Sequence, residues 1–260
     1  VLKGAQKKKY TVEQIEQAGL IVRNQRPEAK IPYYDRFRGR VMFPIRDEQG
    51  RVIGFSGRTM DPDPKAAKYV NSPETPLFKK SRILYALDKA RRHIVETREA
   101  IICEGQIDVI QCHQAGFQTA VASQGTAFTE DHARILQRYA DSVCLSFDPD
   151  RAGQDAAMRS IGTFLEGGLA VRVAMVPAGE DADSLIRKHG GDAYRKVLEH
   201  AETTVAFQIK VLSTRENRQS EVGVMRIAKA VLNTITHSPN AVQRAKMVQE
   251  AAEMLNLPAS

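Results

Sequence analysis

Cysteine and long apolar runs are both scarce in this sequence of 260 residues. The apolar stretches, such as those at 120–122 and 173–177, are no longer than a β-strand, so we expect no segment that spans a bilayer and no membrane partner. No apolar core follows the lysines at the N-terminus, and we therefore expect no secretory signal peptide. Because the first residue is not methionine, we also expect the chain to be part of a longer protein.

The three cysteines argue against two further classes of site. Cys103 and Cys144 lie in apolar runs, and no two of the residues Cys103, Cys112 and Cys144 have the C-x-x-C spacing. We expect buried, reduced thiols rather than a zinc site or a disulfide, and hence a reducing, cytoplasmic location. The composition, 42% hydrophobic and 27% charged, is that of a globular protein rather than a disordered tail.

The net charge of +7 is unevenly distributed along the chain. Residues 1–100 contain 22 Lys and Arg against 12 Asp and Glu, whereas residues 101–200 contain 9 against 14. Eight of the sixteen Phe and Tyr residues lie between positions 31 and 85, among the basic residues. Aromatic rings stack on bases while Lys and Arg neutralise phosphates, so this region is typical of a surface for single-stranded nucleic acid. Two solvated surfaces of opposite sign would give the same charge division.

Secondary-structure signals predict an α/β fold. A capping box at Thr11 and Gln14 indicates a short helix over 11–18, and the turn at 47–50 indicates a hairpin between 40–45 and 51–57. Helical spacing follows over 84–97. Strands are then expected at 100–103, 119–122, 142–147 and 171–176, alternating with helices at 107–114, 129–139, 151–166, 182–188 and 192–200. This alternation predicts a parallel sheet between helices, and the residues after 203 are expected to be helical.

Carboxylates follow three of the expected strands. They are Glu104, Asp108, Asp148, Asp150, Asp181 and Asp183. Ligands of open α/β sheets bind at the carboxyl ends of the strands, and so many like charges there require cations between them. Oxygen ligands favour Mg²⁺ or Mn²⁺. We interpret this group of carboxylates as a site for two-metal chemistry on phosphates. Taken singly, 148–150 could equally be a turn and 181–183 a helix cap.

The spacing of these carboxylates resembles the Toprim domain, which primases, topoisomerases and some nucleases share. The flanking segments YDRFRGRVMFPI (34–45), GFSGR (54–58), KYVNSPET (68–75) and DRAG (150–153) look like the catalytic core of bacterial DnaG-type replicative primases. The chain departs from the family pattern at Gln106, Ile107 and Pro149, and none of these changes removes a carboxylate.

The resemblance implies a function and its residues. It implies DNA-templated synthesis of short RNA primers from ribonucleoside triphosphates on single-stranded DNA, with two or more Mg²⁺ or Mn²⁺ ions. The catalytic residues would be Glu104, Asp148 and Asp150, and all six carboxylates would line the metal site. Nucleotides and template would contact Arg38, Arg40, Arg58, Lys68, Asn71 and Lys80.

The resemblance also implies an organisation. We expect an N-terminally incomplete basic α+β subdomain at 1–98, the Toprim domain at 99–200 and a helical subdomain at 201–260. The family's zinc-binding N-terminal domain and the C-terminal domain that binds the replicative helicase are expected to lie outside this chain, and the location is expected to be the replication fork in the nucleoid. A Toprim-type nuclease or topoisomerase and a non-catalytic single-strand-binding remnant are the two alternatives.

Overall fold

The computed structural model describes residues 1–25, 28, 30–60 and 67–257. The chain divides into two compact units, residues 1–83 and 84–260. The expected boundary at 98/99 differs from this division because helix α3 (Leu87–Thr97) packs Leu87, Ala90 and Ile94 into the core of the sheet that follows it. The division into three domains therefore stays a prediction.

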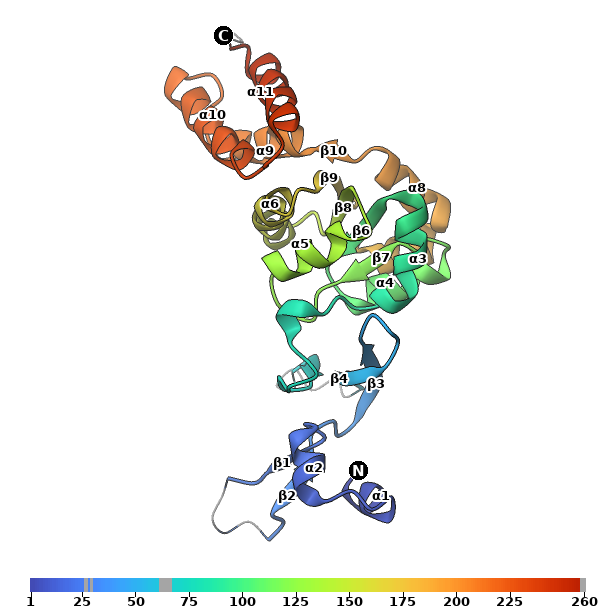
Figure 1. Cartoon of the computed structure of the whole chain (residues 1–260). Coiled ribbons are helices and arrows are strands. Elements are labelled where there is room, and N and C mark those ends of the chain that lie inside the picture. Colours follow the sequence, from blue (N-terminus) through green and yellow to red (C-terminus); the bar gives the residue numbers. More distant parts are fainter. Residues whose placement is uncertain (26–27, 29, 61–66, 258–260) are drawn as a thin grey trace. The chain divides into compact units, whose positions relative to one another are not determined.

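The first unit contains two small antiparallel sheets, one formed by β1 and β2 and one in the order β3-β4-β5 (Figure 1). Its elements are α1 (Leu2–Lys7), α2 (Val12–Gln17), β1 (Ile21–Arg23), β2 (Tyr33–Asp35), β3 (Arg40–Arg46), β4 (Val52–Thr59), β5 (Tyr69–Asn71) and the 3-10 turn Lys80–Arg82. The expected hairpin is confirmed as β3 and β4. Asp47 closes its turn by accepting hydrogen bonds from the amides of Gln49 and Arg51, at 3.0 and 2.9 Å. The sequence did not predict β1, β2 or β5, which are three residues long each.

The predicted capping box is also confirmed, at the start of α2. The Thr11 hydroxyl accepts a hydrogen bond from the amide of Gln14, and the Gln14 side chain accepts one from the amide of Thr11. Gly19 ends this region with a φ of +69°, and a Cβ there would lie 2.3 Å from Cδ of Pro73. Glycine is therefore required at this position by both backbone conformation and packing.

The second unit is built on a five-stranded sheet in the order β10-β9-β8-β6-β7. Its strands are β6 (Glu99–Cys103), β7 (Ala120–Ala122), β8 (Ser142–Phe147), β9 (Ala170–Met175) and β10 (Glu202–Thr203). The strands β6 to β9 pair in parallel, as expected, whereas the two-residue β10 pairs antiparallel with β9. Because β6 has β7 on one side and β8 on the other, the strand order reverses at β6.

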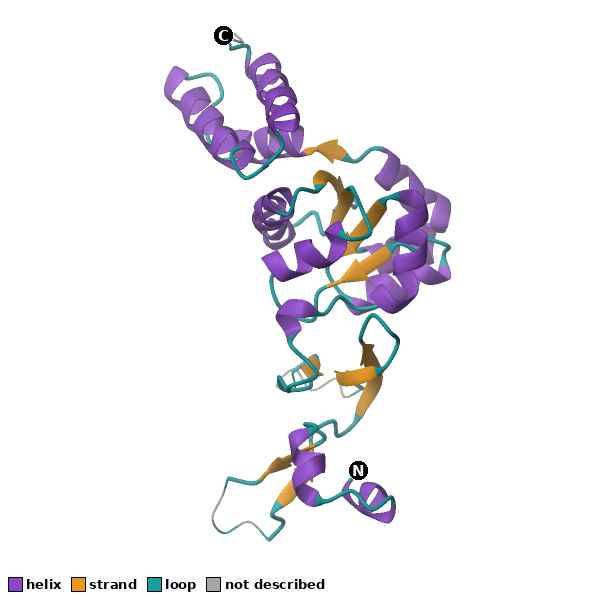
Figure 2. Ribbon diagram, viewed as in Figure 1, coloured by secondary structure: helices purple, strands orange, loops and turns teal. Residues whose placement is uncertain are grey.

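Helices cover both faces of this sheet (Figure 2). They are α4 (Gln106–Gln114), α5 (Glu130–Gln137), α6 (Arg151–Glu166), α7 (Ala182–His189) and α8 (Gly191–Glu199), in addition to α3. Alternate residues of β6 point to opposite cores: Ala100 and Ile102 pack with residues of α3, α5 and α6, whereas Ile101 and Cys103 pack with residues of α4, α7 and α8. This alternation is the period of a strand that is buried on both faces.

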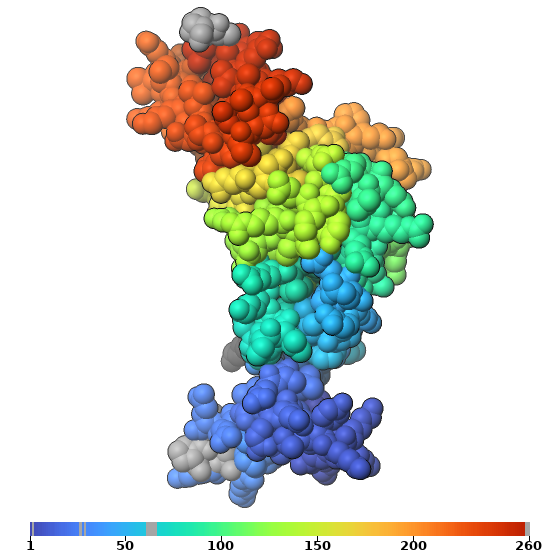
Figure 3. Space-filling view, viewed as in Figure 1, coloured from blue at the N-terminus to red at the C-terminus, as the bar shows by residue number. Residues whose placement is uncertain are grey.

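The expected C-terminal helices are α9 (Thr204–Ser213), α10 (Glu221–Ile235) and α11 (Ala241–Leu255). Their apolar residues, among them Phe207, Val231 and Leu255, belong to the same core as α6 and β9. Figure 3 shows the orange and red residues of these helices packed directly against the yellow residues of the sheet layer. The three cysteines are free and buried, as predicted. Among the described residues, no helix combines the length and the apolar character that a membrane crossing requires.

Candidate metal centre

The centre of the site lies where two neighbouring parallel strands end. Strands β6 and β8 pair with Cys103 opposite Ser146, so the chain leaves both strands side by side at Glu104 and Asp148. The amide of Asp148 donates a hydrogen bond of 2.8 Å to Oε1 of Glu104. The reversal of strand order at β6 places this pair where ligands of open α/β sheets bind.

A glycine makes this close approach possible. A Cβ at Gly153, in the first turn of α6, would lie 2.3 Å from the carbonyl oxygen of Asp148 and 2.8 Å from Oε1 of Glu104. Neither atom can easily move away from such a Cβ, because the Asp148 oxygen belongs to the backbone and the Glu104 oxygen is held by the Asp148 amide. Gly153 therefore lets the start of α6 pack against the end of β8 at this edge of the sheet.

Two of the other carboxylates cap helices. Oδ1 of Asp150 accepts a hydrogen bond of 2.8 Å from the amide of Gly153 at the start of α6. Oδ1 of Asp181 accepts one of 2.7 Å from the amide of Ser184, whose hydroxyl accepts the amide of Asp181 at 3.0 Å. The capping interpretation of 181–183 is thus right for Asp181. Each of these caps uses only one carboxylate oxygen, Oδ1.

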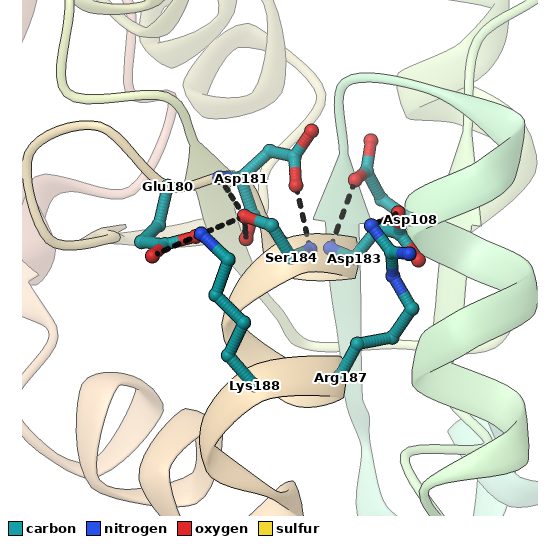
Figure 4. Close-up of polar contacts among 7 residues, drawn as sticks. All are labelled: Asp108, Glu180, Asp181, Asp183, Ser184, Arg187 and Lys188. Atoms are coloured by element: carbon teal, nitrogen blue, oxygen red, sulfur yellow. Dashed lines mark hydrogen bonds and ion pairs between the residues drawn. The ribbon is translucent and has the colours of Figure 1, made fainter.

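Asp108 uses both of its oxygens. Oδ2 accepts the amide of Gly105 at 3.1 Å, and Oδ1 accepts the amide of Asp183 at 3.2 Å (Figure 4). The carboxylate therefore joins the N-terminus of α4 to that of α7, two helices that follow different strands. This geometry suits a structural clamp at the edge of the site at least as well as a metal ligand.

Ion pairs flank the site on α7. Oδ2 of Asp183 lies 3.0 Å from the guanidinium of Arg187, and Oε1 of Glu180 lies 2.8 Å from Nζ of Lys188. Ser184 donates a further hydrogen bond to Glu180. Glu180, Arg187 and Lys188 are not among the site residues expected from the sequence, although the four-residue spacing of Asp183 and Arg187 on a predicted helix was a usable signal.

Burial and mutual repulsion raise the pKa of three of these carboxyls. Desolvation is the largest cause for each. It raises the pKa of Asp108 to about 6, with the charges of Asp181 and Asp148 adding to it. It raises the pKa of Asp148 to about 6, with Glu104, Asp181 and Asp150 adding to it. The pKa of Glu104 is also raised, although the amide of Asp148 opposes the shift. A bound cation would relieve this repulsion.

The donor chemistry fits a divalent cation that prefers oxygen. Across 1–25, 28, 30–60 and 67–257, no three His, Cys, Asp or Glu side chains stand together in an arrangement that would hold one ion. Most of the carboxylates are engaged by amides or by Arg187, and Asp148 is the exception: within the described chain, its carboxylate has no hydrogen-bond or ion-pair partner. The residues therefore fit the metal chemically, but their side chains are not arranged around an ion.

The basic residues expected to bind nucleic acid lie in the first unit. The guanidiniums of Arg38 and Arg58 lie over the rings of Tyr34 and Tyr69, at 5.0 and 5.9 Å from the ring centroids. Lys68 is exposed, and the backbone amide of Lys80 donates to Glu74. Asn71 is half-buried, and its backbone carbonyl accepts a hydrogen bond from Nε of Arg36.

Arg40 differs from the other basic residues of this set. Its Nη1 donates to the carbonyl of Gly57 at 3.0 Å and to that of Ala67 at 2.8 Å. These bonds tie β4 to the segment that leads into β5. The geometry assigns Arg40 a structural role, and its expected contact with nucleic acid stays a prediction.

Comparison with known proteins identifies the family. Residues 1–91 match the N-terminal domain of the DNA primase catalytic core, and residues 101–186 match Toprim-like domains. The structure superposes on a DNA primase domain from Pseudomonas aeruginosa with a TM-score of 0.84 and 37% identity, over 95% of this chain and 77% of that one. The chain belongs to the DnaG primase family.

Other DNA primases are similar to this chain over nearly its whole length. The chain is 38% identical over 257 residues to a DNA primase of Synechococcus elongatus, which covers 96% of this chain and 36% of the relative. A DnaG catalytic domain bound to single-stranded DNA superposes with a TM-score of 0.83 and 39% identity, over 94% of this chain and 76% of that one. The chain spans about two-fifths of the length of the curated primases that it matches, 36% and 41% for the Synechococcus and Staphylococcus epidermidis relatives.

The raised pKa of Asp148 predicts how this DnaG-family chain responds to pH without metal. Asp148 titrates at about 6 when folded, against its ordinary 3.8, so between these values the folded state holds more protons than the unfolded state. The stability contributed by this group is complete below about pH 4 and is lost as the pH rises through about 6. Asp148→Asn should therefore raise the urea midpoint of chelator-treated protein at pH 8 but not at pH 4. Asp192→Asn, at a side chain that is 97% exposed, is the control, and an equal gain in both variants would contradict the prediction.

Two glycines of α6 give a matched test of the packing at the site. Alanine normally stabilises a helix by about 1 kcal/mol relative to glycine. Gly162→Ala should show this gain, since its Cβ would meet nothing closer than 3.6 Å. Gly153→Ala should instead lower the urea midpoint, because its Cβ would overlap the Asp148 carbonyl. A higher urea midpoint in both variants would contradict the prediction, because it would mean that the chain at the end of β8 can move away from a Cβ at residue 153.

Proposed function

We propose that this chain is the catalytic part of a primase, which synthesises short RNA primers on single-stranded DNA from ribonucleoside triphosphates. One observation carries the proposal: in a DnaG-family chain, the Asp148 carboxylate has no hydrogen-bond or ion-pair partner among the described residues, and its backbone amide is bonded to Glu104 where the strand order reverses. We infer the reaction from membership of the family. The location of these carboxylates supports the assignment of the reaction to this edge of the sheet.

We assign Glu104, Asp148 and Asp150 as the catalytic carboxylates that hold Mg²⁺ or Mn²⁺, with Asp181 and Asp183 at the margin of the site. Divalent ions bound there would favour ionisation of the primer 3′-hydroxyl and neutralise the pyrophosphate leaving group. Asp150 and Asp181 would offer the oxygen that their helix caps do not use. Asp108 would hold the starts of α4 and α7 in place, through the amides of Gly105 and Asp183.

We assign contact with template and nucleotide to the basic residues of the first unit. Arg38 and Arg58, each placed over a tyrosine ring, present a cation and an aromatic face together, which suits phosphates and stacked bases. A relative in this family has been solved with single-stranded DNA bound, which supports the same template here. Lys68, Asn71 and Lys80 complete the proposed surface.

The wider partners are also proposals. An Aquifex aeolicus relative has been solved with zinc-binding and RNA polymerase domains, at 28% identity over 60% of its chain. We propose that zinc belongs to such a domain and that the replicative helicase binds another part of the whole protein, at the replication fork in the nucleoid.

Loss of the Asp148 charge should separate chemistry from binding. Asp148→Asn should reduce primer synthesis on single-stranded DNA, with labelled ribonucleotides and Mn²⁺ or Mg²⁺, by at least about 100-fold, because the variant lacks a ligand for the cation that would stabilise the negatively charged transition state. Binding of the same DNA should change less than twofold, and chelator should abolish synthesis by the unaltered chain. Asp192→Asn is the charge-matched control. Near-normal synthesis by Asp148→Asn would disprove the metal-site assignment, and metal-dependent nicking of plasmid DNA without primers would favour a Toprim nuclease.

The salt dependence of binding tests the basic surface. If Lys68 contacts a phosphate, Lys68→Ala should weaken binding of single-stranded DNA and reduce the slope of log K against log salt concentration by about 0.7. Lys229→Ala, an exposed lysine on α10, should leave the slope unchanged. Fluorescence anisotropy at four salt concentrations measures both. Equal slopes for the unaltered chain, Lys68→Ala and Lys229→Ala would show that Lys68 does not contact a phosphate of the DNA.

A further inference from the structure

Helix α7 carries two adjacent cations that engage two different carboxylates. Arg187 reaches Oδ2 of Asp183 at 3.0 Å, and Lys188 reaches Oε1 and Oε2 of Glu180 at 2.8 and 3.0 Å. Figure 4 shows the two side chains extending along α7 from its second turn toward these acidic residues. Asp183 is assigned to the margin of the metal site, whereas Glu180 is not. The ion pair with Arg187 therefore occupies a proposed metal ligand, and the ion pair with Lys188 does not.

The pair of Asp183 with Arg187 is favoured by local structure alone. The acidic residue precedes the basic one by four positions on the same helix, which is the better order for such a pair. Asp183 lies in the first turn of α7, where the helix dipole favours a negative charge, and Arg187 lies in the last turn, where it favours a positive one. The carboxylate is therefore held by its own helix whenever no stronger ligand competes for it.

The exposure of the two partners makes the pair easy to exchange. The Asp183 side chain is 19% exposed, whereas that of Arg187 is 61% exposed. A guanidinium released from Asp183 would be hydrated at once, so its release costs little. Asp183 itself stays in place because its amide is bonded to Asp108 at 3.2 Å. Exchange of the partner therefore requires no movement of the backbone.

We propose that Arg187 is a positioning residue that competes with divalent cations for Asp183. Cations consequently bind more weakly at the Asp181–Asp183 end of the site than at Glu104 and Asp148, where no basic side chain occupies a carboxylate in the described chain. The site fills in two steps, the second of which requires displacement of Arg187. This inference rests on the metal assignment within the proposed function.

Metal binding measured without turnover tests the inference. Free Mn²⁺ is followed by electron paramagnetic resonance during titration of chelator-treated protein at about pH 8, where Asp108 and Asp148 are ionised. The unaltered chain should show a tighter and a weaker class of sites. Arg187→Gln should tighten the weaker class by about two- to fivefold, the range that an exposed ion pair is worth, and leave the tighter class unchanged. A role that merely supports the fold would weaken binding instead.

Two further variants separate competition from a general charge effect. Lys188→Gln removes the same charge from the neighbouring position, where the side chain is 58% exposed, and should change the weaker class less than Arg187→Gln does. In an Asp183→Asn background, Arg187→Gln should have no effect on Mn²⁺ binding, because the carboxylate in dispute is gone. Equal effects of Arg187→Gln and Lys188→Gln, or an Arg187→Gln effect that persists without Asp183, would overturn the inference.

Primer synthesis by the unaltered chain keeps the two proposals distinguishable. If the chain makes primers but Arg187→Gln leaves Mn²⁺ binding unchanged, the primase assignment stands and the competition is disproved. If Arg187→Gln tightens the weaker class as expected while no primers form, the competition stands and the proposed function fails. Thermal unfolding of each variant in chelator establishes that a change in binding reflects the site rather than loss of fold.

Discussion

Repulsion among like charges at one edge of a parallel sheet is the constraint on which this site depends. Two carboxylates about 4 Å apart repel by roughly 4 kcal/mol at an effective dielectric constant of 20, whereas a hydrogen bond to a charged group returns about 1.5 to 3 kcal/mol. One amide for each carboxylate therefore offsets only part of the repulsion. Burial is the largest cause of the raised pKa values of Glu104, Asp108 and Asp148, and the remaining repulsion adds to it. The fold tolerates this edge because the strands beneath it are buried in two cores.

The helix N-termini supply most of the amides. Asp150 caps α6, Asp181 caps α7, and Asp108 joins the amide of Gly105 at the start of α4 to that of Asp183 on α7. A parallel sheet delivers these termini to the same edge as the strand ends, because each strand is followed by a helix that runs back. Capping and metal binding are thus not competing explanations of the acidic residues. The same carboxylate can use one oxygen to start a helix and present the other to an ion.

Much of this arrangement could be predicted from the sequence, because it depends on local patterns. The alternation of buried strands and helices predicted β6 to β9 and the helices between them, and the strand ends predicted which carboxylates meet at one edge. The capping box at Thr11 and the hairpin turn at Asp47 are equally local. The strands β1, β2, β5 and β10 could not be predicted, because two or three residues outside the strand–helix alternation carry no readable period. The bonds from Arg40 to backbone carbonyls could not be predicted either, because they depend on how β4 and the chain before β5 meet.

The pairing of Asp183 with Arg187 shows why a list of acidic positions is an incomplete description of a metal site. Sequence spacing finds the candidate ligands, but the availability of each one depends on its partner in the folded chain. Asp148 has no such partner among the described residues, Asp150 and Asp181 each use one oxygen for a cap, and Asp183 faces a cation of its own helix. Carboxylates that look equivalent in the sequence therefore differ in the structure in how many of their oxygens are available to an ion. In the proposed metal site, this difference favours binding of the first ion at Asp148, whose carboxylate has no contact to break among the described residues.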